Sequence, residues 1–365
     1  MDVIGIVAEY NPFHNGHIYQ IKKVRELYKD AIIIVVVNGY FLERGEISIL
    51  SKDEKTRICL EYGVDLVVEL PFVFGSNSAD IFAESAVTIL NKLGVNKLIF
   101  GSESNNLDLL YESARKQLDS SFDDLVSKQM KSGVNYPTTI NNLVGISIST
   151  PNDLLGVSYI KAILKNDFKI QPVAIQRTND FHDVCLDEQV VSASNVRNRL
   201  LNGEDVSKYT PCTKFNKVDK DLLFKLLRYK IITCKDLSIY LTVDEGIEYK
   251  IKKEIGKANS LDDLILRVKS KRYTYNRIQR MFMHILVGFT KEDKEKLKLE
   301  YIKVLGFNET GKKYLKGIKS DILVSRKISE EFLAQRYELT ASLLYDLVTL
   351  DNTYNFEVNN KPVIK

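Results

Sequence analysis

The chain has few of the residues that build zinc sites, disulfide frameworks or membrane spans. Its 365 residues include only four cysteines, Cys59, Cys185, Cys212 and Cys234, and none of them belongs to a CxxC or CxxH pair. This spacing argues against a structural zinc site and against a disulfide framework. No apolar run is long enough to span a bilayer, and the chain begins almost directly on a strand pattern, without the features of a signal peptide. We therefore expect a cytoplasmic protein with no membrane partner.

The chain as a whole also has no large excess of positive or negative charge, since the net charge is only +4. The distribution is nevertheless uneven. The first 210 residues carry 21 Lys and Arg against 27 Asp and Glu, whereas the remainder carries 31 against 21. This asymmetry predicts that the C-terminal half faces a polyanion while the N-terminal half has another task. Hydrophobic residues make up 44% of the chain, which is enough for two domains or one large one.

Strand and helix patterns alternate through the N-terminal half. Runs rich in strand formers occupy residues 3–7, 31–38, 64–70, 95–100 and 170–176. Ser51 and Glu54 have the spacing of a capping box at the start of one intervening helix, and Pro172 suggests an edge position for the last strand. The alternation predicts an α/β fold with a doubly wound parallel sheet, in which ligands bind beyond the carboxyl ends of the strands.

The C-terminal half has few strand patterns and is predicted to be mainly helical. Leu, Ile and Lys recur at helical spacing in residues 222–232, 261–269, 277–287, 291–305 and 328–350. Residues 121–133 also have a helical pattern, and residues 135–150 are predicted to be a turn-rich connection. Turn-forming residues at 202–219 mark a boundary. We therefore predict an N-terminal domain at 1–205 and a mainly helical, basic domain at 206–365.

The most informative stretch is Val3 to Tyr19, in which a strand pattern, a loop and a helical pattern follow one another. His14 and His17 fall near the start of the predicted helix, where unpaired N–H groups and a partial positive charge favour anions. Gly16 between them allows a ligand to approach the backbone closely. The chain has only four histidines, so a pair at this position predicts an anion site. Solvated loop histidines are the alternative interpretation.

A second stretch, Val190 to Leu200, places hydroxyl and basic side chains at the start of a short predicted helix. Ser192 and Ser194 suit either a helix cap or phosphate oxygens, and Arg197 can neutralise a triphosphate or a leaving pyrophosphate. The segment therefore predicts a phosphate clamp. By itself it is equally typical of a serine-capped surface helix.

Both stretches resemble motifs of one superfamily. Residues 11–17, NPFHNGH, resemble the HxGH signature of the nucleotidyltransferase superfamily, which is related to the HIGH motif of class I aminoacyl-tRNA synthetases, and residues 192–197, SASNVR, resemble its ISSSxxR motif. A KMSKS-like sequence is absent, so an aminoacyl-tRNA synthetase is not expected. Further segments, FLERGE at 41–46, VVELP at 67–71, FGSE at 100–103, PND at 151–153 and RYT at 272–274, resemble the bacterial tRNA(Met) cytidine acetate ligase family over essentially the whole chain.

The resemblance implies a Rossmann-like HIGH nucleotidyltransferase fold and an ATP-dependent ligase. Such an enzyme activates acetate as acetyl-adenylate and transfers the acetyl group to N4 of the wobble cytidine of elongator tRNA(Met), which forms N4-acetylcytidine. His14 and His17 are then expected to stabilise charge on the α-phosphate, with Arg197 assisting pyrophosphate departure. By position, the ATP-binding residues are Val7, Ala8, Glu9, Tyr10, Asn11, Pro12, Phe13, His14, Asn15, Gly16, His17, Gln20, Gly101, Asn152, Arg177, Ser192, Ser194 and Arg197.

Mg²⁺ is expected to bridge the phosphates, although the sequence offers no dedicated set of carboxylates and no metal ligand is predicted. Lys52, Lys55 and Arg57 lie near the site in sequence, but a solvated helix face is the favoured interpretation of this cluster. The relatives tend to have a glycine-containing segment and a Tyr-His pair after Arg177, whereas this chain has TNDFH. The role of His182 therefore stays open, and His284, in an apolar helical pattern, is predicted to be structural.

The tRNA is predicted to bind the basic segment 267–280, RVKSKRYTYNRIQR, which lies in a stretch with no acidic residue between Asp263 and Glu292. Its cations can hold phosphates and its aromatic rings can stack on an unpaired base. The predicted contacts are Lys269, Lys271, Arg272, Tyr273, Tyr275 and Arg277, and no DNA partner is expected. A solvated charged face is the alternative.

Two other functions are compatible with parts of the pattern. A small-molecule nucleotidyltransferase that adenylylates a phosphorylated metabolite would share both phosphate motifs, but it has no use for a basic helical domain of this size. A non-catalytic RNA-binding protein would share the basic half, but the intact histidine pair and Ser/Arg motif argue against it.

Overall fold

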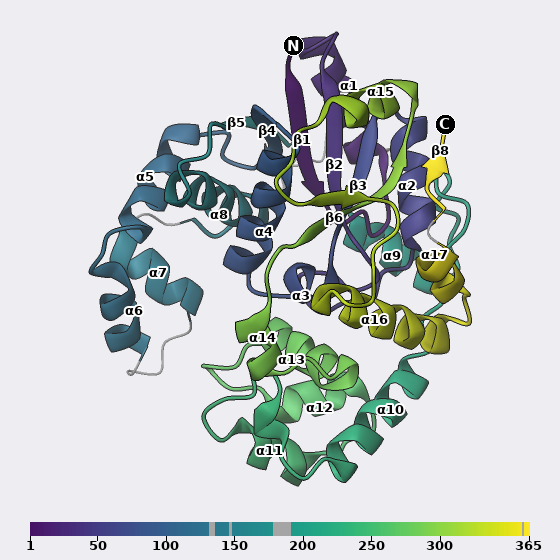
Figure 1. Ribbon diagram of the computed structural model, residues 1–365. Helices are drawn as coiled ribbons and strands as arrows, with labels where there is room; N and C mark the ends of the chain where they lie inside the picture. The colour runs from purple at the N-terminus through teal and green to yellow at the C-terminus, as the bar shows by residue number, and fades with distance from the viewer. Residues whose placement is uncertain (131–135, 146–147, 178–190, 360) are drawn as a thin grey trace.

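A parallel sheet forms the centre of the N-terminal half. The computed structural model describes residues 1–130, 136–145, 148–177, 191–359 and 361–365. Strands β1 (Val3–Ala8), β2 (Ile32–Asn38), β3 (Leu66–Leu70), β4 (Lys97–Ser102) and β5 (Gln171–Gln176) lie in the order β5-β4-β1-β2-β3, and each neighbouring pair is parallel (Figure 1). The predicted doubly wound sheet is confirmed, and β5 lies at its edge as Pro172 indicated.

Helices cover both faces of this sheet because β2 presents apolar side chains to both. Ile32, Ile34 and Val36 join one core cluster with side chains of α4 and α8, while the alternate residues of β2 join another cluster with side chains of α1 and α2. The helices of this half are α1 (Asn15–Leu27), α2 (Lys52–Glu61), α3 (Phe72–Gly75), α4 (Ala79–Lys92), α5 (Leu107–Gln117), α6 (Phe122–Met130), α7 (Tyr136–Val144), α8 (Pro151–Lys165) and α9 (Ala193–Leu201).

Two local predictions in this half are wrong. The segment predicted to be a turn-rich connection contains helix α7, whose polar residues are compatible with a helix that lies away from the sheet (Figure 1). The capping box at α2 does not form, because the Ser51 hydroxyl donates to the Asp53 carboxylate at 2.5 Å and accepts no cap hydrogen bond. No helix within the described ranges is long and apolar enough to cross a membrane.

The C-terminal half is mainly helical, as predicted, but it also extends the sheet. Its elements are α10 (Lys220–Thr233), the short 3₁₀ helix η1 (Leu237–Ile239), α11 (Ile247–Glu254), α12 (Leu261–Val268), α13 (Tyr275–Val287), α14 (Lys291–Lys296), β6 (Tyr301–Phe307), α15 (Glu309–Gly317), β7 (Leu323–Ser325), α16 (Leu333–Thr349), α17 (Thr353–Asn359) and β8 (Val363–Ile364). Helices α10 to α14 lie together below the sheet in Figure 1, and α16 lies between them and the sheet.

Strand β6 corrects the helix predicted over residues 291–305. Helix α14 ends at Lys296, and the buried sequence YIKVLGF then pairs antiparallel with β3, while β7 and β8 pair with β6 in parallel. Its aromatic and β-branched side chains suit a strand that is covered on both faces. The division at residue 205 stays a prediction, and the β3–β6 pairing shows that the C-terminal part contributes to the same sheet.

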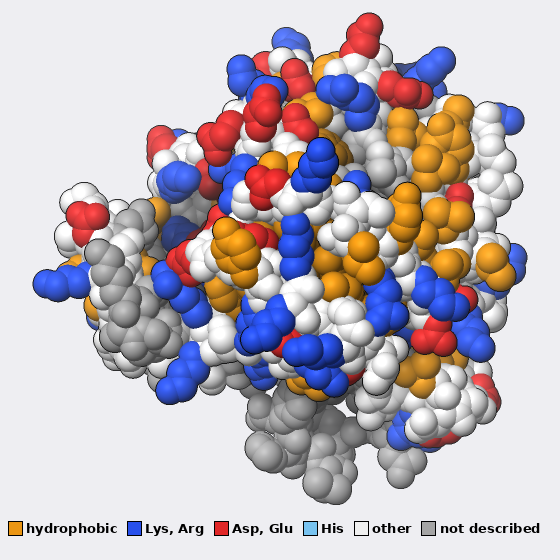
Figure 2. Space-filling model, turned by 90° about the horizontal axis from the view of Figure 1, so that it is seen from below, with side chains coloured by type: hydrophobic (Ala, Val, Ile, Leu, Met, Phe, Trp, Pro, Cys, Tyr) orange, Lys and Arg blue, Asp and Glu red, His pale blue; other side chains and the backbone are white. Residues whose placement is uncertain are grey.

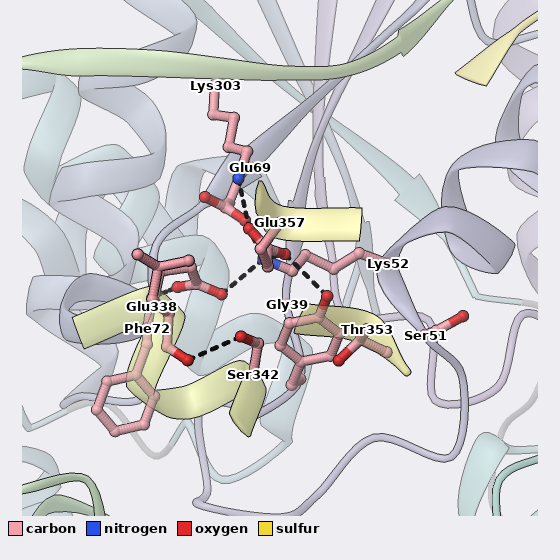
Figure 3. Close-up of polar contacts among 12 residues, drawn as sticks. Gly39, Ser51, Lys52, Glu69, Phe72, Lys303, Glu338, Ser342, Thr353 and Glu357 are labelled. Carbon is pink, nitrogen blue, oxygen red and sulfur yellow. Dashed lines mark hydrogen bonds and ion pairs between the residues drawn. The ribbon is translucent and has the colours of Figure 1, made fainter. Parts of the chain in front are cut away.

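A buried charge network connects the two halves. The interpretation of Lys52 and Lys55 as a solvated helix face is wrong, because both side chains are completely buried. The Lys52 ammonium contacts three carboxylates: Glu338 of α16 at 2.7 Å, Glu69 of β3 and Glu357 of α17 (Figure 3). Lys303 of β6 also pairs with Glu357. These three carboxylates are the one such group, within the described residues, that is close enough to share a metal ion, and a lysine lies among them.

The network holds one more carboxylate than ammonium groups. Lys52 and Lys303 supply two positive charges against those of Glu69, Glu338 and Glu357. Burial, together with the neighbouring Glu338, raises the pKa of Glu69 to about 7, although Lys52 and Lys303 oppose the shift. The Oε2 atom of Glu69 is buried without a hydrogen-bond partner. The Glu69 carboxyl is therefore the group of the network that holds a proton most readily.

Lys52→Met is expected to destabilise the protein strongly, because it leaves three buried carboxylates without their shared cation. Loss of one partner of a buried ion pair costs about 3 to 5 kcal/mol of the free energy of unfolding. Lys165→Met is the matched control, since Lys165 pairs with Glu84 on the exposed surface and its loss should cost about 0.5 kcal/mol or less. Urea unfolding followed by circular dichroism measures both. Equal stabilities of the two variants would contradict the role given to Lys52.

Glu69→Gln is expected to flatten the pH dependence of stability. The folded-state pKa of Glu69 is about 7, above its ordinary value of 4.5, so the folded protein binds this proton more tightly than the unfolded chain. The contribution is fully present below about pH 4.5 and is lost as the pH rises through 7. The wild type should therefore lose stability relative to Glu69→Gln between pH 5 and pH 8 in urea titrations. A constant difference over this range would show that Glu69 does not titrate there.

Candidate active site

A cleft of about 790 Å³ lies at the carboxyl ends of the parallel strands. The first turns of α1, α4, α8 and α9 all contribute to its walls, together with residues of α13. The starts of four helices at one cleft give it partial positive charge, even though side-chain caps occupy backbone N–H groups at several of them. The cleft therefore suits an anionic ligand such as a phosphate chain.

The cleft brings together most of the residues that the sequence predicts for ATP. Those that line it are Val7, Ala8, Glu9, Tyr10, Asn11, His14, Gly16, His17, Gln20, Gly101, Asn152, Arg177, Ser194 and Arg197. Pro12, Phe13, Asn15 and Ser192 do not. Phe13 is instead completely buried in the core, and the Ser192 hydroxyl caps α9 by accepting a hydrogen bond from the backbone of Asn195 at 3.2 Å.

The two histidines cap the helix that they begin. Nδ1 of His14 accepts a hydrogen bond from the backbone N–H of Gly16 at 3.0 Å, and Nδ1 of His17 accepts one from the backbone N–H of His14 at 3.1 Å. The arrangement is a capping box made of two imidazoles, whose ring centres are 3.8 Å apart. Because each Nδ1 accepts, a neutral ring carries its proton on Nε2. Each ring can therefore donate to a ligand in the cleft.

Both imidazoles are neutral at physiological pH. Burial, followed by the charge of Arg177, lowers the pKa of His14 to about 4. Burial and the neighbouring His14 lower the pKa of His17 well below its ordinary value. The histidines can thus supply two hydrogen-bond donors to a phosphate but not two positive charges. Arginines and helix N-termini supply the positive charge of the site.

Arg197 is fixed against the loop that carries the histidines. Its Nη1 donates to the carbonyl of Asn11 at 2.6 Å, and its Nη2 pairs with Glu46 at 3.0 Å and lies 3.3 Å from the Ser194 hydroxyl. The distal Ser/Arg motif and the first loop are therefore in contact in the fold.

Gly101, Asn152 and Arg177 line the cleft at the ends of β4 and β5 and at the start of α8. A Cβ on Gly101 would lie 3.2 Å from Cγ of Arg177, so the small residue makes room for this side chain. The Asn152 amide donates to Glu103 at 2.5 Å, which ties the start of α8 to the loop after β4. These three residues are far apart in sequence, and they meet because β4 and β5 are neighbours in the sheet.

The predicted tRNA-binding segment is only partly available as a surface. Arg272 and Arg277 line the cleft, but each has an acidic neighbour: Arg272 pairs with Glu245 at 2.5 Å, and Arg277 lies 4.0 Å from Asp244. Tyr273 is 6% exposed and its ring is covered by the Arg277 guanidinium at 4.3 Å, so it is not open for stacking on a base.

The hydroxyl of the partly buried Tyr275 donates to Asp262, while Lys269 and Lys271 are exposed. Lys269 and Lys271 are therefore the cations of the segment that are most accessible to a polyanion.

The remaining two histidines are not among the described residues that line the cleft. His182 lies outside the described residues. His284 is buried with Nε2 2.8 Å from the carbonyl oxygen of Ser76, which confirms a structural role.

A pair of side chains in the cleft was missed by sequence reasoning. Glu43, in the loop at residues 39–50 between β2 and α2, accepts from Nη1 of Arg280 of α13 at 2.7 Å. Its backbone N–H donates to the Glu9 carboxylate at 2.7 Å, and burial raises the pKa of Glu43 although Arg280 opposes the shift. The FLERGE segment was noted only as part of a resemblance, and the partner from α13 is far away in sequence.

Comparison with known proteins places the chain among enzymes with this architecture. The family model of the HIGH nucleotidyl transferases matches residues 1–361. The tRNA(Met) cytidine acetate ligase of Oceanobacillus iheyensis is 36% identical over 86% of this chain and 86% of its own, and that of Bacillus subtilis is 32% identical over 95% and 92%. The crystal structure of TmcAL from Thermotoga maritima bound with alpha-thio ATP covers 100% of this chain and 99% of its own, with 26% identity and a TM-score of 0.86.

His14→Asn is expected to separate the capping role of His14 from its ligand role. Asparagine is among the best N-cap residues, so the free energy of unfolding should stay within about 0.5 kcal/mol of the wild type, whereas His14→Ala should lose about 1 kcal/mol. Both variants lack the Nε2–H donor and should bind ATP about tenfold more weakly or worse, since a hydrogen bond to a charged group is lost. Urea unfolding and calorimetric titration with ATP measure the two effects. If His14→Asn bound ATP with wild-type affinity, His14 would act only as a helix cap.

Proposed function

The chain belongs to the tRNA(Met) cytidine acetate ligase family within the HIGH nucleotidyl transferases, and from this we propose that it acetylates N4 of the wobble cytidine of elongator tRNA(Met) at the expense of ATP. The observation that carries the proposal is the pair of neutral imidazoles at the start of α1, whose Nε2 donors are left for a ligand in the cleft. The ATP analogue bound by the structural relative supports ATP as the ligand.

The proposed chemistry has two steps because acetate is a poor acyl donor. An acetate oxygen attacks the α-phosphorus of ATP, the bond to the β-phosphate oxygen breaks, and acetyl-adenylate and pyrophosphate form. The exocyclic N4 amine of cytosine then attacks the acetyl carbonyl carbon, AMP leaves, and N4 loses one proton. The enzyme accelerates the first step by stabilising charge that develops on the phosphate oxygens.

The described side chains suit these roles. His14 and His17 are held by backbone hydrogen bonds, so their donors need no rearrangement when charge develops. Arg197 lies beside the same loop and can accompany the departing pyrophosphate. Arg177, whose charge already depresses the histidine pKa values, adds a positive charge on the β5 side.

Mg²⁺ is proposed to arrive with the phosphates of ATP and not in a site built by the protein. The cleft carboxylates already have partners: Glu9 accepts from Asn38 and from the backbone of Glu43, Glu43 pairs with Arg280, Glu46 pairs with Arg197, and Asp80 pairs with Lys161. Mg²⁺ in nucleotide sites keeps several waters and is held largely by phosphate oxygens. These pairings favour a Mg²⁺ ion that is held mainly by the phosphates of ATP.

The tRNA is proposed to bind a wider surface than the sequence indicated. Figure 2 shows Lys and Arg side chains among exposed hydrophobic ones on the face that lies below the sheet. Helices α10 and α11 carry the exposed rings of Tyr229 and Tyr249, 70% and 75% exposed, next to exposed lysines such as Lys225 and Lys252. Exposed rings and cations suit an RNA with unpaired bases better than the covered Tyr273 does.

Incubation with ATP, ¹⁴C-acetate and bulk tRNA, followed by digestion to nucleosides, tests the proposal. Label is expected in N4-acetylcytidine and only with ATP present, with one AMP and one pyrophosphate released per acetyl group. Exchange of labelled pyrophosphate into ATP should depend on acetate, which reports adenylate formation separately. Label in no nucleoside, together with adenylylation of a phosphorylated metabolite, would instead identify a small-molecule nucleotidyltransferase.

A further inference from the structure

The sheet order divides the cleft into two sides around the first loop. β1 lies in the middle of the order β5-β4-β1-β2-β3, and the predicted ATP residues Gly101, Asn152 and Arg177 all belong to the β4 and β5 side. The β2 side is formed by the 39–50 loop and by α13, which contact each other, and none of the predicted ATP residues comes from either segment. A cleft of about 790 Å³ is near the upper end of the range for small-molecule sites, so it has room for more than one substrate.

The wall on the β2 side presents an acceptor next to a set of donors. Oε1 of Glu43 accepts from Nη1 of Arg280, and its Oε2 lies 3.9 Å from Nε of the half-exposed Arg44 and makes no hydrogen bond to the described residues. The hydrogen bonds of Arg280 to the described residues all come from Nη1 and go to Glu43. Both side chains line the cleft, so Nε and Nη2 of Arg280 and the second Glu43 oxygen, whose ion pair with Arg44 is long, are the polar atoms of the pair that a ligand could contact.

Aromatic side chains also line the cleft. Tyr159 of α8 is 4% exposed and lines the cleft, and its hydroxyl has no hydrogen-bond partner among the described residues. Burial raises the pKa of the Tyr159 hydroxyl, and the charges of Glu9 and Glu43 raise it further. Phe82 and Phe100 also line the cleft. A flat, polar-edged ring fits such a wall better than acetate does, because acetate is repelled by the carboxylates.

The geometry points to the Glu43–Arg280 pair as the subsite that recognises the Watson–Crick edge of the acceptor cytosine. This inference rests on the proposed function. A carboxylate oxygen accepts a hydrogen bond from N4 of cytosine, and the neighbouring guanidinium can donate to the ring acceptors N3 and O2. Uracil has an acceptor at position 4 and a donor at N3, so both contacts are reversed and unfavourable. A base drawn out of its stack is read in this way in other base-modifying enzymes.

The pair also joins α13 to the 39–50 loop, and this competing role must be separated from recognition. Gly45 has a φ of +77°, and a Cβ there would lie 2.7 Å from the backbone nitrogen of Arg280, so loop and helix are in close contact. Gln279 contributes to the same contact by donating to the carbonyl of Gly45 at 3.4 Å, but it does not line the cleft. Gln279→Ala is therefore a matched control that weakens the contact between α13 and the 39–50 loop without changing the cleft wall.

The test compares Glu43→Gln, Arg280→Lys and Gln279→Ala in the full chain. Acetate-dependent exchange of pyrophosphate into ATP should stay within about twofold of the wild type in all three. Acetyl transfer to tRNA should fall about tenfold to a hundredfold in Glu43→Gln and Arg280→Lys, the range for loss of one bidentate base contact, and stay near wild type in Gln279→Ala. As a second readout, RNA hairpins with cytosine or uracil at the target position compete with tRNA. The preference for cytosine should shrink in Glu43→Gln.

Each outcome decides between the two roles. The inference is overturned if both cleft variants transfer acetyl groups at the wild-type rate, or if the preference for cytosine is unchanged. It is also overturned if exchange and transfer fall in parallel, as expected when the contact between α13 and the 39–50 loop is merely loosened. A wild-type enzyme that exchanges pyrophosphate but acetylates no cytidine would overturn the proposed function instead, so the two failures are distinguishable.

Discussion

The arrangement of the cleft depends on two lysines that are completely buried beside it. Lys52 holds Glu69, Glu338 and Glu357 together, and thereby fixes α16 and α17 of the C-terminal half against β3 and α2. Lys55, one turn further along α2, donates to the carbonyls of Asn38 and Gly39 at 3.0 and 2.9 Å. Both ends of the loop that carries Glu43 are therefore held by the same helix. Helix α16 in turn packs against α3 and α13, so the position of Arg280 is connected to the same network.

A network of this kind specifies an arrangement more than it adds stability. Removing five charged groups from water is costly, and hydrophobic side chains of similar volume often give equal or greater stability. What the charges require is geometry, because three carboxylates from β3, α16 and α17 must meet one ammonium. Apolar side chains would tolerate small shifts of α16 over the sheet. We expect the ion network to restrict such shifts, because its three carboxylates must stay in contact with one ammonium group.

The strands and helices of the N-terminal half could be predicted from the sequence, because hydrophobic periodicity and turn residues depend on neighbouring positions. Alternating strand and helix patterns and the position of Pro172 located the five parallel strands and the edge, and the His14–His17 spacing located the helix N-terminus. Interactions between distant segments were not predictable in this way. Lys52 and Glu338 are 286 residues apart, and Glu245 and Asp244, which pair with Arg272 and Arg277, lie outside the acid-free stretch that suggested an open basic surface. Tyr273 was assigned to base stacking for the same reason, although tertiary packing covers its ring.

The neutral state of the histidines gives the site a particular electrostatic character. A cationic imidazole pair would bind the triphosphate and its products tightly in every state, whereas a buried neutral pair donates hydrogen bonds whose strength grows as charge develops on the phosphate. The burial of His14 and the use of each Nδ1 as a cap acceptor both keep the rings neutral. The positive charge is left to arginines on the periphery, where Arg197 already has Glu46 as an alternative partner. If Arg197 contacts the departing pyrophosphate as proposed, its pair with Glu46 can re-form when the product leaves, so release does not leave the guanidinium unpaired.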